Sequence, residues 1–432
     1  MRVIQLAVIS STFVLLAHNS VAQTPPQLTT LYSFTGQNGD GGSPQCTLTK
    51  GPGGVLYGTT YYGGTASLGT VFELTPPAAA GGAWTETVLY SFTGQNGDGS
   101  FPRNGVAVAS SGVLYGTTDN GGAGPCPLGC GTAFSLTPPA SPGGAWTESV
   151  LHKFGTKKGD GFLYPSNLVI GPGGVLYGAT HGQSGPPPNK GGVVFRLKPP
   201  AAPGGQWTEA VLHTFNGQNG EGSFPNGVIV INGSLYGTSQ AGGAFNGGTV
   251  FELTPPSSAG QPWAEAILYS FPNQSPAVYH PTGALVAAAN GALYGTAFFG
   301  AYSPPPCYNQ CGAIFELSPP SAPGGTWTET ILYDFTGPDN NDGRQPVGVL
   351  LRNGVLYGTT TYGGPSDNGT VFALAPPSGS GGAWSETVLY SFTGPTDGAT
   401  PFGGLVAGAN GALYGTNSQA ALGFGTVFQL TP

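Results

Sequence analysis

The segment "GVLYGTTYYGGTASLGTVFELTPP" (residues 54–77) contains two short apolar runs joined by a glycine-rich stretch. The same words return as "GVLYGTTDNGGAGPCPLGCGTAFSLTPP" (residues 112–139) and as "GALYGTNSQAALGFGTVFQLTP" (residues 411–432). The word Leu-Tyr-Gly occurs seven times, with its tyrosine at Tyr57, Tyr115, Tyr177, Tyr236, Tyr294, Tyr357 and Tyr414. Such regular recurrence indicates a repeat architecture, in which each unit buries its faces against its neighbours.

Each repeat unit divides into four short strands, which we name A to D. In the second copy the predicted strands are A (residues 105–110), B (113–118), C (131–137) and D (146–154). Turn residues rich in glycine and proline separate them, and helical periodicity is absent. Seven four-stranded units of this kind predict an all-β fold, a seven-bladed β-propeller.

The two ends of the chain carry complementary parts of one unit. Residues 28–34 ("LTTLYSF") read as a strand D without preceding strands, and the chain ends directly after a strand C at residues 424–431. We therefore predict that the N-terminal strand pairs with this strand C and completes the seventh blade. Such pairing closes the ring and leaves no free sheet edge.

Composition and charge limit the classes of partner. Only 7% of residues are charged and the net charge is −8, while 77 glycines and 41 prolines supply turns. So few cations argue against nucleic acid and against an anionic membrane surface as partners. Residues 1–22 resemble a secretory signal peptide, so we expect residues 23–432 to form one exported, secreted or periplasmic domain. We expect no membrane span after signal removal and a monomer.

The repeated "LYGTT…GG…GTVFEL" words resemble the GloVer tandem repeat of secreted bacterial proteins, the choice-of-anchor tandem repeat proteins. The resemblance covers essentially the whole chain after the signal. It implies a propeller-like fold and an extracytoplasmic location. The family has no assigned activity, so the resemblance supplies no catalytic residues to carry over.

Function is expected on the face that the B–C and D–A loops share. The B–C loops differ in every unit, and variable loops on a rigid scaffold are common binding sites. Candidates for ligand binding are residues on this face that break the repeat. They are Lys157, Lys158, His181, Tyr279, His280, Phe298, Phe299 and Tyr302.

Six of the seven D–A loops carry an acidic residue followed by glycine. These acids are Asp40, Asp98, Asp160, Glu221, Asp342 and Asp397. The favoured interpretation is a turn in which the carboxylate caps backbone amides. A ring of Ca²⁺ ligands is an alternative, although the loops lack the ligand density of a calcium loop. A paired-carboxylate glycosidase is a third, but acids repeated in every unit do not mark one active site. We expect no other cofactor.

The histidines and cysteines indicate mainly structural roles. His152 and His213 occupy a strand D position that is tyrosine in the other five copies, so we expect a structural role. Two C-x-x-x-C pairs lie in equivalent B–C loops, and in an exported protein such pairs predict disulfides. The pairs are Cys126 with Cys130 and Cys307 with Cys311. Cys46 is expected to be a buried free thiol.

Three functions are compatible with these features. The first is a non-catalytic module that binds an extracellular protein or glycan through the B–C and D–A face. The second is a carbohydrate-active propeller enzyme, a hydrolase or lyase, and the third is a structural component of the envelope. Clustering of the repeat-breaking residues in one pocket would favour the enzyme, whereas their scatter around the rim would favour the other two.

Overall fold

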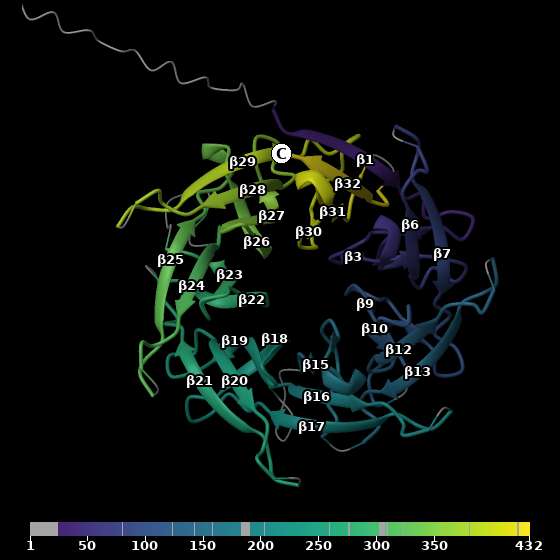
Figure 1. The fold of residues 1–432 in the computed structure, drawn as a ribbon, viewed down its shortest axis with the longest axis horizontal. Helices are drawn as coiled ribbons and strands as arrows, with labels where there is room; N and C mark the ends of the chain where they lie inside the picture. The colour runs from purple at the N-terminus through teal and green to yellow at the C-terminus, as the bar shows by residue number, and fades with distance from the viewer. Residues whose placement is uncertain are drawn as a thin grey trace, which may run out of the picture.

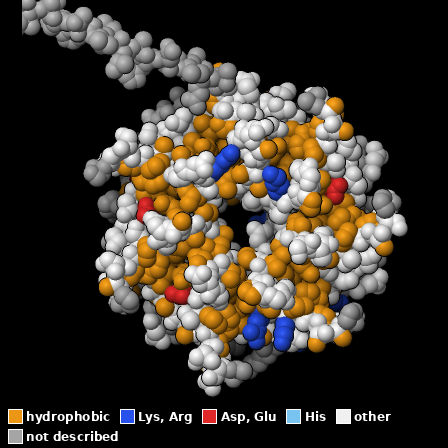
Figure 2. Space-filling view, in the orientation of Figure 1, with side chains coloured by type: hydrophobic (Ala, Val, Ile, Leu, Met, Phe, Trp, Pro, Cys, Tyr) orange, Lys and Arg blue, Asp and Glu red, His pale blue; other side chains and the backbone are white. Residues whose placement is uncertain are grey.

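The computed structural model describes residues 25–432 with short gaps. The gaps are residues 80, 123, 142, 158, 183–190, 203, 259, 275–276, 302–306, 308–309, 323, 380 and 421–422. The described strands form seven four-stranded antiparallel sheets arranged as blades around a central opening (Figures 1 and 2). The all-β, seven-bladed propeller is thus confirmed. The signal-peptide prediction, residues 1–22, lies outside the described residues.

Within each blade, strand A lies at the centre of the propeller and strand D at its outer edge. Blades are numbered along the chain. Blade 1 holds β3 (Thr49–Lys50), β4 (Leu56–Thr60), β6 (Thr70–Thr75) and β7 (Thr85–Ser91). Blade 2 holds β9 (Ala107–Val108), β10 (Leu114–Thr118), β12 (Thr132–Thr137) and β13 (Thr147–Lys153). Blade 3 holds β14 (Val169–Ile170), β15 (Leu176–Thr180), β16 (Val193–Lys198) and β17 (Thr208–Thr214). Blade 4 holds β18 (Gly222–Ile231), β19 (Ser234–Gly242), β20 (Thr249–Thr254) and β21 (Ala264–Ser270).

The remaining blades follow the same plan. Blade 5 holds β22 (Tyr279–Ala287), β23 (Leu293–Phe299), β24 (Ala313–Ser318) and β25 (Thr328–Asp334). Blade 6 holds β26 (Gly343–Arg352), β27 (Val355–Gly363), β28 (Thr370–Ala375) and β29 (Ser385–Ser391). Blade 7 holds β30 (Val406–Ala407), β31 (Leu413–Asn417), β32 (Thr426–Thr431) and β1 (Gln27–Ser33). Two small ladders join β2 (Gly41–Gly42) to β5 (Tyr62–Gly63) and β8 (Gly99–Ser100) to β11 (Asn120–Gly121). Four single-turn 3₁₀ helices span Pro52–Gly54, Pro172–Gly174, Pro338–Asn340 and Ala409–Gly411.

The seventh blade contains both ends of the described chain. β1 pairs antiparallel with β32, from Gln27 opposite Thr431 to Ser33 opposite Thr426. Figure 1 shows the N-terminal strand, in purple, lying outside the C-terminal strand, in yellow. The predicted closure by the N-terminal strand is therefore confirmed.

One aromatic contact recurs at every boundary between blades. A phenylalanine at the end of strand D meets the strand C phenylalanine of the next blade edge to face or tilted, with centroids 5.0–5.2 Å apart. Phe34 makes this contact with Phe72 across the closing boundary, and both side chains are almost completely buried. Because such rings bury large apolar areas, the seven pairs hold the ring together.

The repeated Leu-Tyr-Gly-Thr word has a packing role at each position. Tyr57 contacts Trp146 of the next blade, with centroids 6.4 Å apart. A Cβ on Gly58 would lie 2.5 Å from the ring of Phe72, so glycine makes room for that ring. This close approach lies within one blade. Thr59 Oγ1 donates to the carbonyl of Asn104 in blade 2, at 2.8 Å.

Strand A is only two residues long in four blades. The second copy was expected to pair over residues 105–110, but only Ala107–Val108 joins strand B. The preceding residues instead face the neighbouring blade, as the bond from Thr59 to Asn104 illustrates. In blades 4 and 6 strand A runs for 10 residues into a two-residue turn. Asn-Gly forms both turns, with positive φ at each residue, the combination that such tight hairpins require.

Candidate functional site

Each D–A loop carries one residue, which we call the rim position, whose backbone conformation recurs in all seven blades. This rim position directly precedes the proline that leads into strand A. It is occupied by Ser43, Phe101, Tyr164, Phe224, His280, Gln345 and Thr400. All seven have φ between 47° and 62°, a left-handed conformation that is uncommon for residues other than glycine.

Contacts with the preceding blade hold this strained backbone in place. The amide of Phe101 donates to the carbonyl of Leu68, at 2.8 Å, and the equivalent amide donates to the preceding blade at five other boundaries. Before blade 3 the donor is Leu163, one residue ahead of Tyr164. The next residue packs as well, because a Cβ on Gly69 would lie only 2.5 Å from Cδ of Pro102. The conformation is thus set by the scaffold and not by the rim side chain.

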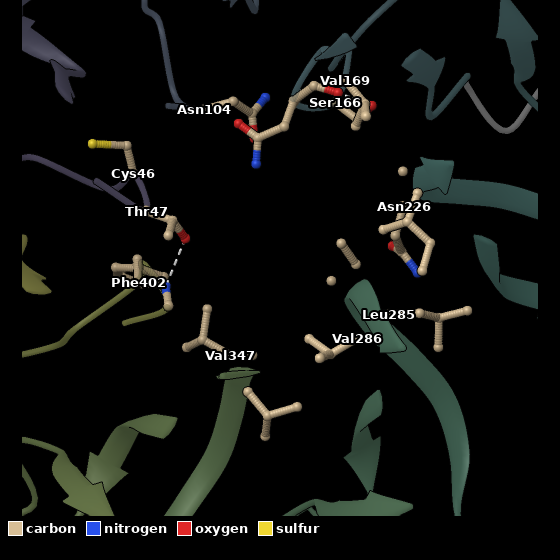
Figure 3. Close-up of a pocket in the computed structure, with 18 of the residues that line it drawn as sticks. Cys46, Thr47, Asn104, Ser166, Val169, Asn226, Leu285, Val286, Val347 and Phe402 are labelled. Atoms are coloured by element: carbon tan, nitrogen blue, oxygen red, sulfur yellow. Dashed lines mark hydrogen bonds between the residues drawn. The ribbon is translucent and has the colours of Figure 1, made fainter. Parts of the chain in front are cut away.

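A cavity of about 400 Å³ lies in the central channel, lined by residues that follow the rim positions in the chain. Residues from all seven blades line it, and Figure 3 shows Val169, Val286, Val347 and Phe402 around its wall together with the amide of Asn226. Arg103 is the only charged residue among the described lining residues. A wall of aliphatic side chains and neutral amides suits binding better than acid–base chemistry.

Aromatic side chains from blades 1 to 4 form a continuous row on the B–C and D–A face. We call this row the aromatic arc. Its rings are those of Tyr61, Tyr62, Phe101, Tyr164, His181 and Phe224, and the guanidinium of Arg103 lies between the rings of Tyr61 and Tyr164. The rings of Tyr61 and Phe101 lie 5.2 Å apart, and Arg103 Cζ lies 5.4 Å from the ring of Tyr61 and 5.5 Å from that of Tyr164. Tyr164 meets His181 at 6.5 Å, and His181 stacks on Phe224 at 5.0 Å. Tyr62 and Tyr164 are each 50% exposed, so the arc is open to solvent.

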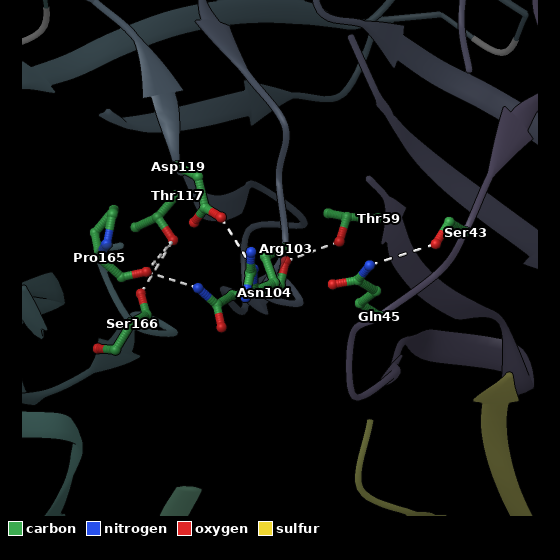
Figure 4. Close-up of polar contacts among 9 residues, drawn as sticks. All are labelled: Ser43, Gln45, Thr59, Arg103, Asn104, Thr117, Asp119, Pro165 and Ser166. Carbon is green, nitrogen blue, oxygen red and sulfur yellow. Dashed lines mark hydrogen bonds and ion pairs between the residues drawn. The ribbon is translucent and has the colours of Figure 1, made fainter. Parts of the chain in front are cut away.

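Arg103 links the arc to a buried carboxylate. Its Nε donates to Asp119 Oδ2 at 3.0 Å, and Asp119 is only 1% exposed (Figure 4). Burial raises the pKa of Asp119 to about 6, and the Arg103 charge opposes this rise. Asn104 Nδ2 and Thr117 Oγ1 both donate to the carbonyl of Pro165, which ties blade 2 to blade 3 at the same rim. The guanidinium is therefore held in position between the two tyrosine rings.

The described members of the predicted ligand-binding set fall into separate places, and none of them lines the cavity. His181 belongs to the aromatic arc. In blade 5, Tyr279 stacks on Phe299 at 4.4 Å, and His280 and Phe298 contact the same ring. In the loop before blade 3, the backbone amide of Lys157 donates to Asp160. Lys158 and Tyr302 lie outside the described residues.

The acids of the D–A loops hold their own loops together. Asp98 Oδ2 accepts bonds from the amide and hydroxyl of Thr93, both at 2.7 Å, and from the hydroxyl of Tyr90 at 3.2 Å. Asp40, Asp160, Glu221, Asp342 and Asp397 likewise accept bonds from backbone amides of the same loop. These contacts are the ones that the turn interpretation predicts. The Ca²⁺ interpretation remains a prediction.

A second carboxyl group lies near most of these acids, at the outer edge of the boundary between two blades. It is the glutamate of the Trp-x-Glu word on strand D of the next blade. Burial, and then the charge of the nearby aspartate, raise the pKa of Glu86, Glu148 and Glu386 to about 7. In place of the usual tyrosine, His152 lies 3.4 Å from Asp160 and His213 lies 2.6 Å from Glu221.

The cysteine predictions are confirmed. Cys126 is bonded to Cys130 and Cys307 to Cys311, with Cα atoms 5.2 and 5.1 Å apart. Cys46 is a buried free cysteine whose Sγ accepts a bond from the amide of Thr59, and burial raises its pKa. Two short disulfides are typical of an extracytoplasmic compartment.

Sequence reasoning missed most of the aromatic arc. Three of its rings, Phe101, Tyr164 and Phe224, stand directly before the recurring proline of the D–A loop. The sequence feature that could have indicated these rings is an aromatic residue directly before proline, in "FPRN", "YPSN" and "FPNG". It was overlooked because each aromatic residue recurs in neighbouring copies and so did not look like a departure from the repeat.

Comparison with known proteins identifies the repeat. The family model described as Gloeobacter/Verrucomicrobia repeat matches residues 20–184, 127–321 and 263–432, which confirms the resemblance of the repeated words. No curated protein sequence matches the chain. In the described part of the chain, no helix has the length and apolar character needed to cross a membrane.

Solved structures share the fold at low sequence identity. One is the extracellular domain of a hybrid two-component system from B. thetaiotaomicron, with a TM-score of 0.51 and 11% identity, covering 94% of this chain and 42% of that one. Another is the polysaccharide lyase Uly1, with a TM-score of 0.51 and 13% identity, covering 90% of each chain. This chain spans less than half of the length of the first. At such identities the likeness is one of fold alone.

Proposed function

We propose that this chain, which belongs to the Gloeobacter/Verrucomicrobia repeat family, is an exported, monomeric and non-catalytic binding module for an extracellular glycan. The single observation that carries the proposal is the aromatic arc beside the channel mouth. Its rings come from four neighbouring blades, and two of them are half exposed. The C–H face of a sugar ring packs well on such aromatic surfaces, whose edges also carry hydroxyl groups.

The charge around the arc favours a glycan without many acidic groups. Arg103 is already paired with Asp119 and sandwiched between Tyr61 and Tyr164, so its charge is largely satisfied. Free cations that would attract a strongly acidic polymer are few in the whole chain, which carries 11 lysines and arginines against 19 acids. A neutral polysaccharide is the ligand class that fits this surface.

The placement of the acids supports a non-catalytic role. Glycoside hydrolysis commonly requires two carboxyl groups facing each other across the bound sugar. The described residues that line the channel cavity include no aspartate, glutamate or histidine. The D–A loop acids are instead occupied with backbone amides of their own loops.

The test is a glycan array followed by calorimetry on each hit. We expect at least one neutral polysaccharide to bind, and the double variant Tyr62→Ala/Tyr164→Ala to weaken binding at least 10-fold. Phe245→Ala is the matched control, because Phe245 is 62% exposed in the B–C loop of blade 4 but outside the arc. This variant should bind like the unmodified protein.

Three results would overturn the proposal. An array without hits would exclude a glycan ligand, and unchanged affinity in the double variant would exclude the arc as its site. Release of new reducing ends or unsaturated sugars from a bound glycan would show an enzyme instead of a binding module.

A further inference from the structure

The polar cluster at the boundary between blades 3 and 4 differs from its counterparts. Elsewhere the usual set is a strand D tyrosine and a loop aspartate, with the Trp-x-Glu glutamate of the next blade beside them. Here His213 stands in place of the tyrosine and Glu221 in place of the aspartate. This is the only one of the seven boundaries at which both residues change. The third member, Glu265, is the usual glutamate.

The three side chains converge on one small volume. His213 Nε2 lies 2.6 Å from Glu221 Oε1 and 3.7 Å from Glu265 Oε2. One ligand atom from each side chain can be chosen so that all three lie within 4.8 Å of one another. The groups come from different elements, since His213 lies on β17, Glu221 on the following D–A loop and Glu265 on β21.

This donor set matches the coordination chemistry of a divalent transition metal ion. Zn²⁺ binds imidazole nitrogen and carboxylate oxygen at about 2.0–2.2 Å, which places two ligands of a tetrahedral ion about 3.3 Å apart. The two measured distances from Nε2, 2.6 and 3.7 Å, lie on either side of that value. The side chains retain 18%, 14% and 15% exposure, which gives a water molecule access as the fourth ligand.

Neighbouring boundaries provide a contrast within the same molecule. At the boundary between blades 2 and 3, His152 also replaces tyrosine, but the loop acid is the shorter Asp160, and its Oδ2 lies 3.4 Å from the imidazole. These residues do not form a comparable three-ligand group among the described residues. Oε1 of Glu265 is buried and lacks a hydrogen-bond partner, and so does the equivalent atom of Glu86, Glu148, Glu209 and Glu386. The boundary between blades 3 and 4 therefore differs from the others through His213 and Glu221, which complete the three-ligand group.

We propose that His213, Glu221 and Glu265 bind one Zn²⁺ ion, which joins blade 3 to blade 4. In this site the neutral imidazole donates its Nε2 lone pair and the two carboxylates each supply one oxygen. The ion would replace the direct bond between His213 and Glu221. The site is separate from the aromatic arc and independent of the proposed glycan binding.

The experiment is a calorimetric titration of the chelator-treated, full chain with ZnCl₂, alongside Co²⁺ absorption spectra. We expect one ion per chain and the visible bands of tetrahedral Co²⁺. His213→Tyr, which restores the residue of five other blades, should weaken Zn²⁺ binding at least 100-fold. Zn²⁺ should raise the urea midpoint of the unmodified protein but not that of the variant, because the ion binds only the folded state.

Two further variants keep the result unambiguous. Glu265→Gln preserves the shape of a ligand side chain and should also weaken binding at least 10-fold. His152→Tyr is the matched control and should bind Zn²⁺ like the unmodified protein. Absence of Zn²⁺ binding would overturn the proposal and would leave His213 in contact with the carboxylates alone. Equal affinity in all variants, or equal loss in the His152→Tyr control, would place the ion elsewhere and overturn the proposal.

Discussion

Closure of the ring can be tested at Phe34, the residue through which the N-terminal strand contacts blade 1. Phe34 is 1% exposed, and its ring lies 5.1 Å from Phe72 and 5.0 Å from Tyr32. Truncation to alanine removes the transfer free energy of a buried ring and leaves a cavity, which together cost about 3–5 kcal/mol. We therefore expect Phe34→Ala to lower the free energy of unfolding by this amount.

The matched comparison is Phe215→Ala, because Phe215 makes the same contact with Phe251, at 5.0 Å, in the middle of the chain. If the closing boundary is as well packed as an internal one, the two losses should agree within about 1 kcal/mol. Phe402→Ala is the exposed control, since this ring is 41% exposed at the channel mouth, and it should cost about 0.5 kcal/mol or less.

Urea unfolding followed by tryptophan fluorescence measures these differences. Trp84 of blade 1 lies 5.9 Å from Tyr414 of blade 7 and so reports on the closing boundary itself. A loss below about 1 kcal/mol for Phe34→Ala, with the full loss for Phe215→Ala, would refute the closure argument. It would mean that the N-terminal strand adds little to the stability of the ring.

Two further predictions concern charge. Glu86, Glu148 and Glu386 have pKa values of about 7 in the folded protein, raised from 4.5 chiefly by burial. At a pH between 4.5 and about 7, these side chains are therefore protonated in the folded state but ionised in the unfolded chain. The free energy of unfolding should therefore fall as pH rises from about 5 to 8, and Glu148→Gln should flatten this slope in urea titrations; a rising slope would contradict the reasoning. Arg103→Ala leaves Asp119 buried without its cation and should cost about 1–3 kcal/mol. Adding Asp119→Asn should recover at least half of that loss in thermal unfolding, and no recovery would show that the ion pair is not the cause.

The fold could be predicted from the sequence because the same strand-forming motifs recur in every blade. Each copy of Leu-Tyr-Gly-Thr specifies one strand and its contacts with the next blade, and the unpaired strands at residues 28–34 and 424–431 specify how the ring closes. The site could be predicted only in part. His181 was expected on the binding face, but the ring that stacks on it, Phe224, belongs to blade 4, and no local spacing shows which rings meet across a blade boundary. The pairing of Arg103 with Asp119 depends likewise on the arrangement of the loops in space.

The left-handed rim positions have a consequence for how such proteins diversify. At six of the seven positions the backbone amide donates a hydrogen bond to the preceding blade, and a proline follows at all seven. These constraints hold the unusual φ whatever side chain is present. Serine, aromatic residues, histidine, glutamine and threonine all occupy this place in a single chain. Every blade thereby offers one position whose side chain can be exchanged, and new ligand preferences could evolve at these seven positions while the strands of each unit stay unchanged.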